Sequence, residues 1–182
     1  MAILRAALEL FAERGVDGTS IEQIAKRAGV ARLTVYRRWS SKEELLVQAI
    51  VYGRNAPTLT DDEYDTLPYP EVLVRMVGSM AESISTRQLA PLLAQLIGST
   101  FSHPELFDAF WAASGEKRRE GGIRLVQRAI RDGLLPADSD PDIIVDIIVG
   151  ALFYRLLVPP RHDDVQEFIQ RVLRQIGFRA IP

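Results

Sequence analysis

Four basic side chains fall within residues 29–46 of a chain whose formal net charge is −2. They are Arg32, Arg37, Arg38 and Lys42. Residues 1–52 carry eight Lys and Arg against six Asp and Glu, whereas the remaining residues carry 14 against 18. Because the positive charge is local, the chain has the small basic face that suits a polyanion such as a nucleic acid.

Residue types that catalyse reactions or hold metal ions are missing or isolated. The chain contains no cysteine, which excludes thiol chemistry, cysteine zinc sites and redox switching. The two histidines, His103 and His162, have no suitably spaced ligand partners, and no glycine-rich phosphate loop, nucleophile elbow or HExxH motif occurs. We therefore expect no enzyme, no catalytic residue, no cofactor and no metal site.

No apolar stretch is long enough for a membrane-spanning helix. Such a helix needs about 18 to 20 apolar residues, and the nearest candidate, residues 143–158, is interrupted by two charged residues and a glycine. The apolar N-terminal residues are not followed by a small-residue cleavage site, so we expect a helix there and not a signal peptide. These patterns predict a soluble, cytoplasmic protein.

Hydrophobic spacing places the basic segment within a group of short helices. A helix is expected over residues 2–14, with Gly15 as its C-terminal cap. The sequence TSIE at residues 19–22 has the form of a capping box and begins a second helix that ends before Gly29. A third helix over residues 31–39 completes a helix-turn-helix arrangement.

The third helix is expected to bury Val35 and Trp39, which lie four residues apart, and to leave its basic residues outside. The next helix begins after Ser40 and Ser41, which are good N-terminal caps. Lys42 lies in its first turn, where a cation is disfavoured by roughly 0.3 to 1 kcal/mol. Its presence indicates that this helix end faces an anion such as phosphate.

Residues 53–70 contain three prolines and an acidic cluster, which predict a loop and a boundary between domains at 1–52 and 53–182. Proline spacing then predicts helices over about 71–85, 87–100, 104–132, 141–158 and 164–176. Gly121 and Gly122 predict a bend or break in the longest of them. The expected fold is all-α with about nine helices.

From Ile3 to Ile50 the chain resembles the TetR family of bacterial transcriptional regulators, through the sequence ALELFAERGVDGTSIEQIAKRAGVARLTVYRRWSSKEELL. The resemblance implies a three-helix DNA-binding domain, a connecting fourth helix and a larger helical domain that binds a ligand and dimerises. The later sequence GGIRLVQRAIRDGLLPADSDPDIIVDIIVGALFYRLLV is similar to one common class of TetR C-terminal domain.

The resemblance implies a role for each residue of the DNA-binding face. The residues expected to contact backbone phosphates are Thr34, Tyr36 and Lys42. The residues expected nearest to base edges are Arg32, Leu33 and Arg37, and Arg38 fits either set. An arginine can engage guanine through two hydrogen bonds and a leucine can contact a thymine methyl group, so these residue types suit the major groove.

The resemblance also favours a largely apolar ligand pocket, although helical core is the default interpretation of any single apolar residue. The candidate pocket residues are Met76, Met80, Phe101, Phe107, Phe110, Trp111, Tyr154 and Arg155. A charge at Arg155 inside an apolar helix is costly unless it is paired. We favour an ion pair with Asp108 or Glu105; an anionic ligand or a contact across a dimer is the alternative.

The last two helices are expected to dimerise as a four-helix bundle. The predicted interface residues are Ile144, Ile148, Leu152, Phe168, Ile169, Val172, Leu173 and Ile176. The leading hypothesis is a homodimeric bacterial repressor, released from a near-palindromic operator by a small, largely apolar ligand. The alternative is a small-molecule-binding or interaction protein whose helix-turn-helix no longer binds specific DNA.

Overall fold

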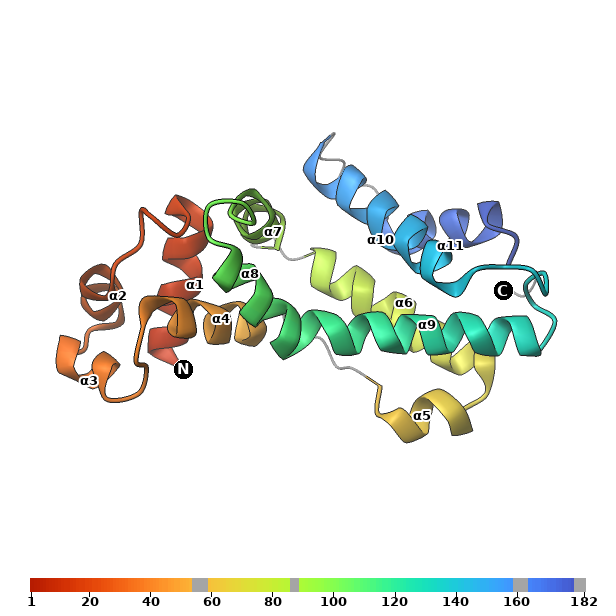
Figure 1. Ribbon diagram of the computed structural model, residues 1–182, viewed down its shortest axis with the longest axis horizontal. Helices are drawn as coiled ribbons and strands as arrows, with labels where there is room; N and C mark the ends of the chain where they lie inside the picture. The colour runs from red at the N-terminus through yellow and green to blue at the C-terminus, as the bar shows by residue number, and fades with distance from the viewer. Residues whose placement is uncertain (54–58, 86–88, 159–163, 179–182) are drawn as a thin grey trace. The chain divides into compact units, whose positions relative to one another are not determined.

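The computed structural model describes residues 1–53, 59–85, 89–158 and 164–178, without the side chains of residues 61, 80, 82–85 and 89. Every regular element within these ranges is helical (Figure 1). The prediction of an all-α fold is therefore confirmed. None of these helices is both long and apolar enough to cross a membrane.

The helices form two compact units. The first, here called the N-terminal unit, comprises Met1–Asn55 and Thr86–Glu116; the C-terminal unit comprises Ala56–Ser85 and Lys117–Pro182. The sequence predicts a single boundary, near residue 53. In the structure a later segment, Thr86–Glu116, also belongs to the N-terminal unit, although the prediction assigns it to the second domain.

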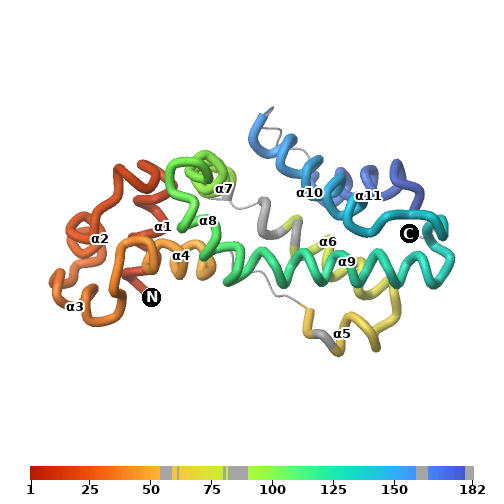
Figure 2. Tube along the Cα trace, in the orientation of Figure 1, coloured from red at the N-terminus to blue at the C-terminus, as the bar shows by residue number. Residues whose placement is uncertain are grey.

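The N-terminal unit contains α1–α4, α7, α8 and a π-helical turn (Figure 2). Their bounds are Ala2–Arg14 for α1, Ile21–Ala28 for α2, Arg32–Tyr36 for α3, Lys42–Gly53 for α4, Leu89–Gly98 for α7, Pro104–Phe110 for α8 and Trp111–Gly115 for the π-helical turn. Helix α1 packs on α2, α4 and α7, and α4 also packs on α8. The buried side chains at their contacts include Phe11, Ile24, Leu45, Ile50 and Leu96.

The start of α2 differs by one residue from the prediction. Ser20 is the N-cap, its hydroxyl accepts a hydrogen bond from the Gln23 backbone, and the Gln23 side chain accepts one from the Ser20 backbone. Thr19 is buried and its hydroxyl donates to the Gly15 carbonyl at 2.7 Å. The predicted capping box at residues 19–22 is therefore wrong, because Thr19 closes the preceding turn instead.

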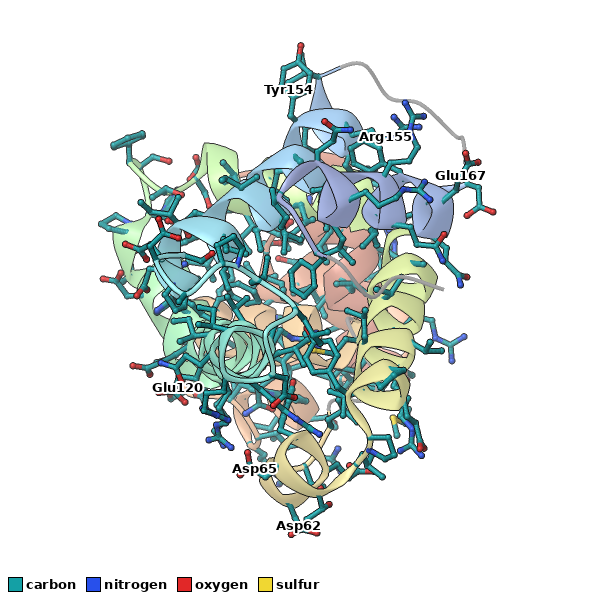
Figure 3. All side chains as sticks on the ribbon, turned by 90° about the vertical axis from the view of Figure 1, so that its right-hand side faces the viewer. Asp62, Asp65, Glu120, Tyr154, Arg155 and Glu167 are labelled. Atoms are coloured by element: carbon teal, nitrogen blue, oxygen red, sulfur yellow. The ribbon has the colours of Figure 1, made fainter. Side chains whose placement is uncertain are left out.

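The C-terminal unit contains α5, α6, α10, α11 and all of α9 except its first residue. Their bounds are Asp61–Thr66 for α5, Tyr69–Ser85 for α6, Glu116–Arg131 for α9, Pro141–Leu157 for α10 and Val165–Gln175 for α11. Figure 3 looks along α9 and shows the side chains that fill the space between these helices. The core includes Val72, Leu125, Ile144, Ile169 and Leu173.

Helix α5 lies where the sequence predicts a loop. Thr60 caps it, and the Thr60 and Glu63 side chains and backbones bond reciprocally in a capping box. Arg128 of α9 donates to the Tyr64 carbonyl at 2.9 Å, and the Tyr64 side chain is buried in the core. The Thr60–Glu63 spacing was the sequence signal for this helix, and the neighbouring prolines obscured it.

The predicted break at Gly121 and Gly122 is wrong, because α9 is continuous through both residues. The irregularity lies earlier, in the π-helical turn, which separates α8 from α9. Gly121 is needed for close packing instead: a Cβ atom at this position would lie 2.5 Å from the Tyr64 hydroxyl. The π-helical turn divides one predicted helix into α8 and α9, and α5 was not predicted. The described ranges therefore contain eleven α-helices, two more than predicted.

A methyl group at Gly121 should therefore disturb the contact between α5 and α9. We expect Gly121→Ala to lower the free energy of unfolding by about 1 to 3 kcal/mol, because the buried Tyr64 ring must move. Gly78→Ala in α6 is the matched control, since a Cβ there meets nothing within 4 Å. It should raise stability by about 0.5 to 1 kcal/mol. Denaturant unfolding that gives equal stabilities for both variants would contradict this packing.

Candidate functional site

The short helix α3 is held by two buried side chains. Val35 is fully buried and Trp39, just beyond the helix, is nearly so. The Trp39 backbone N–H donates to the Val35 carbonyl at 3.1 Å, and its indole Nε1 donates to Gln48 Oε1 of α4 at 2.9 Å. A helix of five residues has little stability of its own, so these contacts decide its orientation.

The rest of this segment is exposed. Arg32, Leu33, Thr34, Tyr36, Arg37 and Arg38 all have exposed side chains. Leu33 is 61% exposed and Tyr36 is 50% exposed, so an apolar and an aromatic side chain share the surface with the basic ones. Arg32 lies 3.6 Å from Glu22, but both side chains are open to solvent, and such a pair is weak. Hydrogen-bond donors and apolar side chains are therefore exposed together on α3 and on the two residues that follow it.

Lys42 has a structural partner. Its Nζ donates to the Val16 carbonyl at 2.9 Å and lies 3.9 Å from Glu43, and the side chain is largely covered. The cost of a cation at the start of α4 is therefore offset within the protein, which sequence reasoning attributed to an external anion alone. A phosphate contact by Lys42 stays a prediction.

The connection between α1 and α2, residues 15–20, is a meeting point of several helices. The Val16 carbonyl accepts a hydrogen bond from Lys42 of α4, and Asp17 Oδ1 lies 3.1 Å from His103 Nε2 at the start of α8. A Cβ at Gly15 would lie 2.7 Å from the Gln95 amide oxygen of α7. The position of α2, and of α3 beyond it, is thus fixed by contacts with three other helices.

The start of α4 is capped by a carboxylate. Glu44 accepts hydrogen bonds from the Ser40 backbone at 2.8 Å and from the Ser40 hydroxyl at 2.7 Å, and the Ser41 hydroxyl accepts one from the Glu44 backbone. The bonds from Ser40 lower the pKa of Glu44 below its ordinary value. The bond to Ser41 confirms one of the two expected caps, whereas the Ser40 hydroxyl donates to Glu44 instead of accepting from the helix. Together these bonds fix the turn that joins Trp39 to α4.

The predicted pocket residues belong to two different units, and two of them are largely exposed. Phe101 is 98% exposed and Tyr154 is also exposed, so neither lines an interior pocket. Phe107, Phe110 and Trp111 lie in the N-terminal unit, where the Phe107 ring stacks on Trp111 at 6.2 Å and lies 6.4 Å from Phe110. Met76 packs against the core of the C-terminal unit, and the side chain of Met80 lies outside the described residues.

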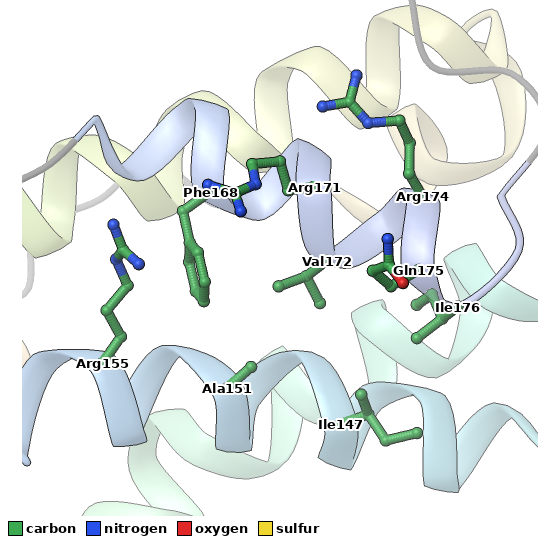
Figure 4. A pocket seen from close by; sticks show the side chains of 9 residues that line it. All are labelled: Ile147, Ala151, Arg155, Phe168, Arg171, Val172, Arg174, Gln175 and Ile176. Atoms are coloured by element: carbon green, nitrogen blue, oxygen red, sulfur yellow. The ribbon is translucent and has the colours of Figure 1, made fainter.

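Arg155 lies on α10 in the C-terminal unit, and its guanidinium carbon is 4.1 Å from the centre of the Phe168 ring of α11. Asp108 and Glu105, its predicted ion-pair partners, lie in the N-terminal unit. Figure 4 shows the groove between α10 and α11, with Arg155 facing Phe168. The groove has a volume of about 600 Å³ and is lined by Ile147, Ala151, Arg155, Phe168, Arg171, Val172, Arg174, Gln175 and Ile176.

The predicted dimer residues divide into two groups. Ile144, Leu152, Ile169 and Leu173 are buried in the chain's own core, so they are not available to a partner. Ile148 is half-buried against the same core, whereas Phe168, Val172 and Ile176 line the groove. The spacing of apolar residues correctly identified an apolar face on α11. Part of this face packs within the same chain and is therefore not exposed to a second copy.

Sequence reasoning missed the exposed apolar stripe of α10. Ile143, Ile147, Tyr154 and Val158 are exposed, and their spacing places them on one side of the helix. The signal was present as a period of three to four residues. It was hidden because α10 is apolar on nearly every side, so the sequence did not distinguish the core-facing side from the outer one.

Two family profiles match the chain. Residues 3–49 match the family described as "Bacterial regulatory proteins, tetR family", and residues 65–176 match "Tetracyclin repressor-like, C-terminal domain". A transcriptional regulator of Bacillus subtilis, YdeS, is 28% identical over 186 residues, which cover 99% of this chain and 88% of that protein. The DNA-binding transcriptional repressor TetR of Mycobacteroides abscessus is 27% identical, covering 96% and 90% of the two chains.

Solved structures share the fold. The regulator FadR of Bacillus subtilis, solved with stearoyl-CoA, superposes with a TM-score of 0.75 at 19% identity, covering 97% of both chains. MexZ, a repressor from Pseudomonas aeruginosa, gives 0.69 at 21% identity over 98% of this chain and 94% of the other. The matched family and these proteins are transcriptional regulators and not enzymes.

The cap at α4 should make stability depend on pH. Because the pKa of Glu44 is lowered in the folded chain, its contribution is complete above the ordinary value of 4.5 and is lost as pH falls through the folded value. We expect Glu44→Gln to be less stable than the parent near pH 7, with the difference shrinking below pH 4.5. Unfolding curves between pH 7 and 3 measure this.

Glu43→Gln is the matched control, because it removes one negative charge from the same helical turn without touching Ser40 in the described structure. A difference between Glu44→Gln and the parent that is constant with pH would mean that the Glu44 carboxylate does not cap α4 as a charged group.

Proposed function

The chain belongs to the TetR family of bacterial regulatory proteins, and from that premise we propose a homodimeric repressor that a small, largely apolar ligand releases from its operator. Membership of this family identifies the protein as a DNA-binding transcriptional regulator. The observation that carries the proposal is the exposed face of α3 above the buried Val35 and Trp39. We place its action in the bacterial cytoplasm, where the operator would be.

We assign the exposed face of α3 to the major groove of DNA. Arg32, Leu33 and Arg37 would lie nearest to base edges, where arginine can engage guanine and leucine can contact thymine. Thr34, Tyr36 and Lys42 would contact phosphates, with Arg38 in either role. Lys42 would do so while one of its three N–H groups remains on the Val16 carbonyl, since an ammonium group has two more to donate.

The repressor assignment rests on named relatives. The Mycobacteroides abscessus protein and MexZ are both described as repressors. A repressor of this kind needs two states that differ in affinity for DNA, and a ligand that favours the state with the lower affinity. FadR, solved with stearoyl-CoA, is a relative in fold that binds a ligand with a long apolar chain.

We propose that the dimer forms through the outer face of α10 and the groove beside it. Ile143, Ile147, Tyr154 and Val158 would be covered by the partner, which would remove an apolar stripe from water. A helix of the second copy fits against the groove lined by Phe168 and Val172. Two such helices from each copy make a four-helix bundle.

Selection of bound duplexes from a random pool tests the function. The proposal predicts a near-palindromic consensus, whose binding weakens steeply as salt increases because phosphate contacts release counterions. Enrichment of no sequence, with weak binding that salt abolishes, would contradict it. That outcome would favour the alternative of an interaction protein whose helix-turn-helix no longer binds specific DNA.

A substitution at Arg32 should relax sequence preference at one position in each half-site. We expect Arg32→Ala to reduce discrimination there by about 1 to 3 kcal/mol, because a two-hydrogen-bond contact with guanine would be lost. Lys26→Ala is the control for charge, since Lys26 is exposed on α2. Binding of single-base operator variants measures both. An unchanged preference profile for Arg32→Ala would remove this residue from base recognition.

A charge in the apolar stripe of α10 should prevent dimerisation. We expect Ile147→Glu to weaken self-association by roughly tenfold or more, equal to about 1.4 kcal/mol, because the carboxylate would be desolvated in the interface. Val74→Glu is the control, since Val74 is an exposed β-branched apolar residue on α6, 56% exposed against 45% for Ile147. Sedimentation equilibrium should give the parent's dimer dissociation constant for the control and a constant at least about tenfold higher for Ile147→Glu. Equal self-association of both variants would place the interface elsewhere.

A further inference from the structure

Glu22 is the only acidic residue in the basic part of the chain, residues 19–42, which also carries six Lys and Arg. It lies in the first turn of α2, and its side chain is exposed. Phosphate groups repel a carboxylate, so a negative charge beside the proposed DNA-binding face lowers the affinity for duplexes of every sequence. Glu22 therefore works against binding unless its charge improves recognition in another way.

The start of α2 does not depend on Glu22 for its cap. The capping box is formed by Ser20 and by the side chain of Gln23. Ile21 and Ile24 are buried in the N-terminal unit and hold this turn in place. The Glu22 carboxylate is thus positioned by a well-anchored turn and is available to another group.

That group is the guanidinium of Arg32, the first residue of α3. Glu22 Oε2 lies 3.6 Å from Arg32 Nη1. The pair adds little stability, because both side chains are open to solvent. Its effect is to favour one direction of the Arg32 side chain over the others, and in the described chain no carboxylate lies at ion-pair distance from Arg37 or Arg38.

A guanidinium beside a duplex can bind either a base edge or a phosphate. It carries five N–H groups, of which two engage guanine, so the others stay free for a carboxylate of the protein. A neighbouring carboxylate repels a phosphate, which is charged, more strongly than the edge of a guanine, which is neutral. The charge of Glu22 would therefore disfavour a phosphate contact by Arg32 and leave guanine as its better partner.

We propose that Glu22 is a positioning residue for base recognition. Its carboxylate holds the Arg32 guanidinium in place for guanine and keeps it from pairing with the nearest phosphate. Glu22 thus increases sequence preference at the cost of some affinity, without contacting a base itself. This inference rests on the proposed contact between Arg32 and DNA, and it adds a residue of α2 to the recognition of sequence.

Binding of the full chain to a selected operator, to its single-base variants and to an unrelated duplex tests the role of Glu22. We expect Glu22→Gln to reduce discrimination by about threefold or more at the position that Arg32→Ala relaxes, because the two residues are coupled. The same variant should bind the unrelated duplex more tightly than the parent does, because a negative charge is removed. In the double variant, discrimination should equal that of Arg32→Ala alone.

Glu43→Gln is the matched control. Glu43 also lies in the first turn of a helix, and its carboxylate is 3.9 Å from the adjacent Lys42, which is proposed to contact a phosphate. This variant removes the same charge from the same unit, so it should also bind all duplexes more tightly. Its preference profile should match that of the parent, because Arg32 keeps its partner.

Three results would overturn the proposal while the parent still selects an operator. They are an unchanged profile for Glu22→Gln, an equal loss of discrimination at every position, and the same loss in Glu43→Gln. Thermal unfolding adds to this comparison: a lower melting temperature of Glu22→Gln with an unchanged profile would assign Glu22 to the stability of α2 alone. A parent that selects no operator would instead overturn the proposed function, and the positioning role with it.

Discussion

The burial of Val35 and Trp39 is the constraint on which the exposed surface of α3, proposed to contact DNA, depends. Helix α3 has five residues, too few to be stable in isolation, and its direction is set by what lies beneath it. Trp39 is tied to α4 through Gln48, and α4 packs on α1, so the small helix rests on the interior of the N-terminal unit. The side chains that this leaves outside are those that could meet DNA.

Within the N-terminal unit, contacts from three other helices position the connection that precedes α2 and α3. The α1–α2 connection is contacted by Lys42 of α4 and His103 of α8, and Gln95 of α7 lies against Gly15. Since α7 and α8 follow α6 in the chain but pack with α1 and α4, the helices of the proposed DNA-binding face share one compact unit with later helices. A displacement of α7 or α8 would therefore act directly on α1 and α4, and reach α3 only through them and α2.

Most helices, and the exposure of the residues on and just after α3, could be predicted from sequence, because apolar spacing and caps are local signals. Gly29 ends α2 in a left-handed conformation, and Val35 and Trp39 are buried as their spacing indicates. The errors arose where a long-range contact decided the outcome. Gly121 lies in a continuous helix, where its lack of a side chain lets Tyr64 pack against it, and nothing within the sequence of α9 reveals this contact with α5.

In the C-terminal unit, the sequence alone likewise could not distinguish core residues from candidate binding residues. Helix α10 is apolar on nearly every side, so its sequence could not separate Ile144, which faces the core, from Ile143, which faces outward. The predicted pocket residues were chosen by type, and the structure places Phe101 and Tyr154 on the surface.

The central claim, that α3 reads DNA as one of a symmetric pair, is tested most directly by methylation protection on a selected duplex. Guanine N7 lies in the major groove, so bound recognition helices should protect it in two patches about one helical turn, or a multiple of that, apart. Two such patches, both lost when Trp39 is replaced by alanine in a chain that keeps its helix content, would agree with the account. Protection in a single patch, or binding without any protection of guanine N7, would contradict it.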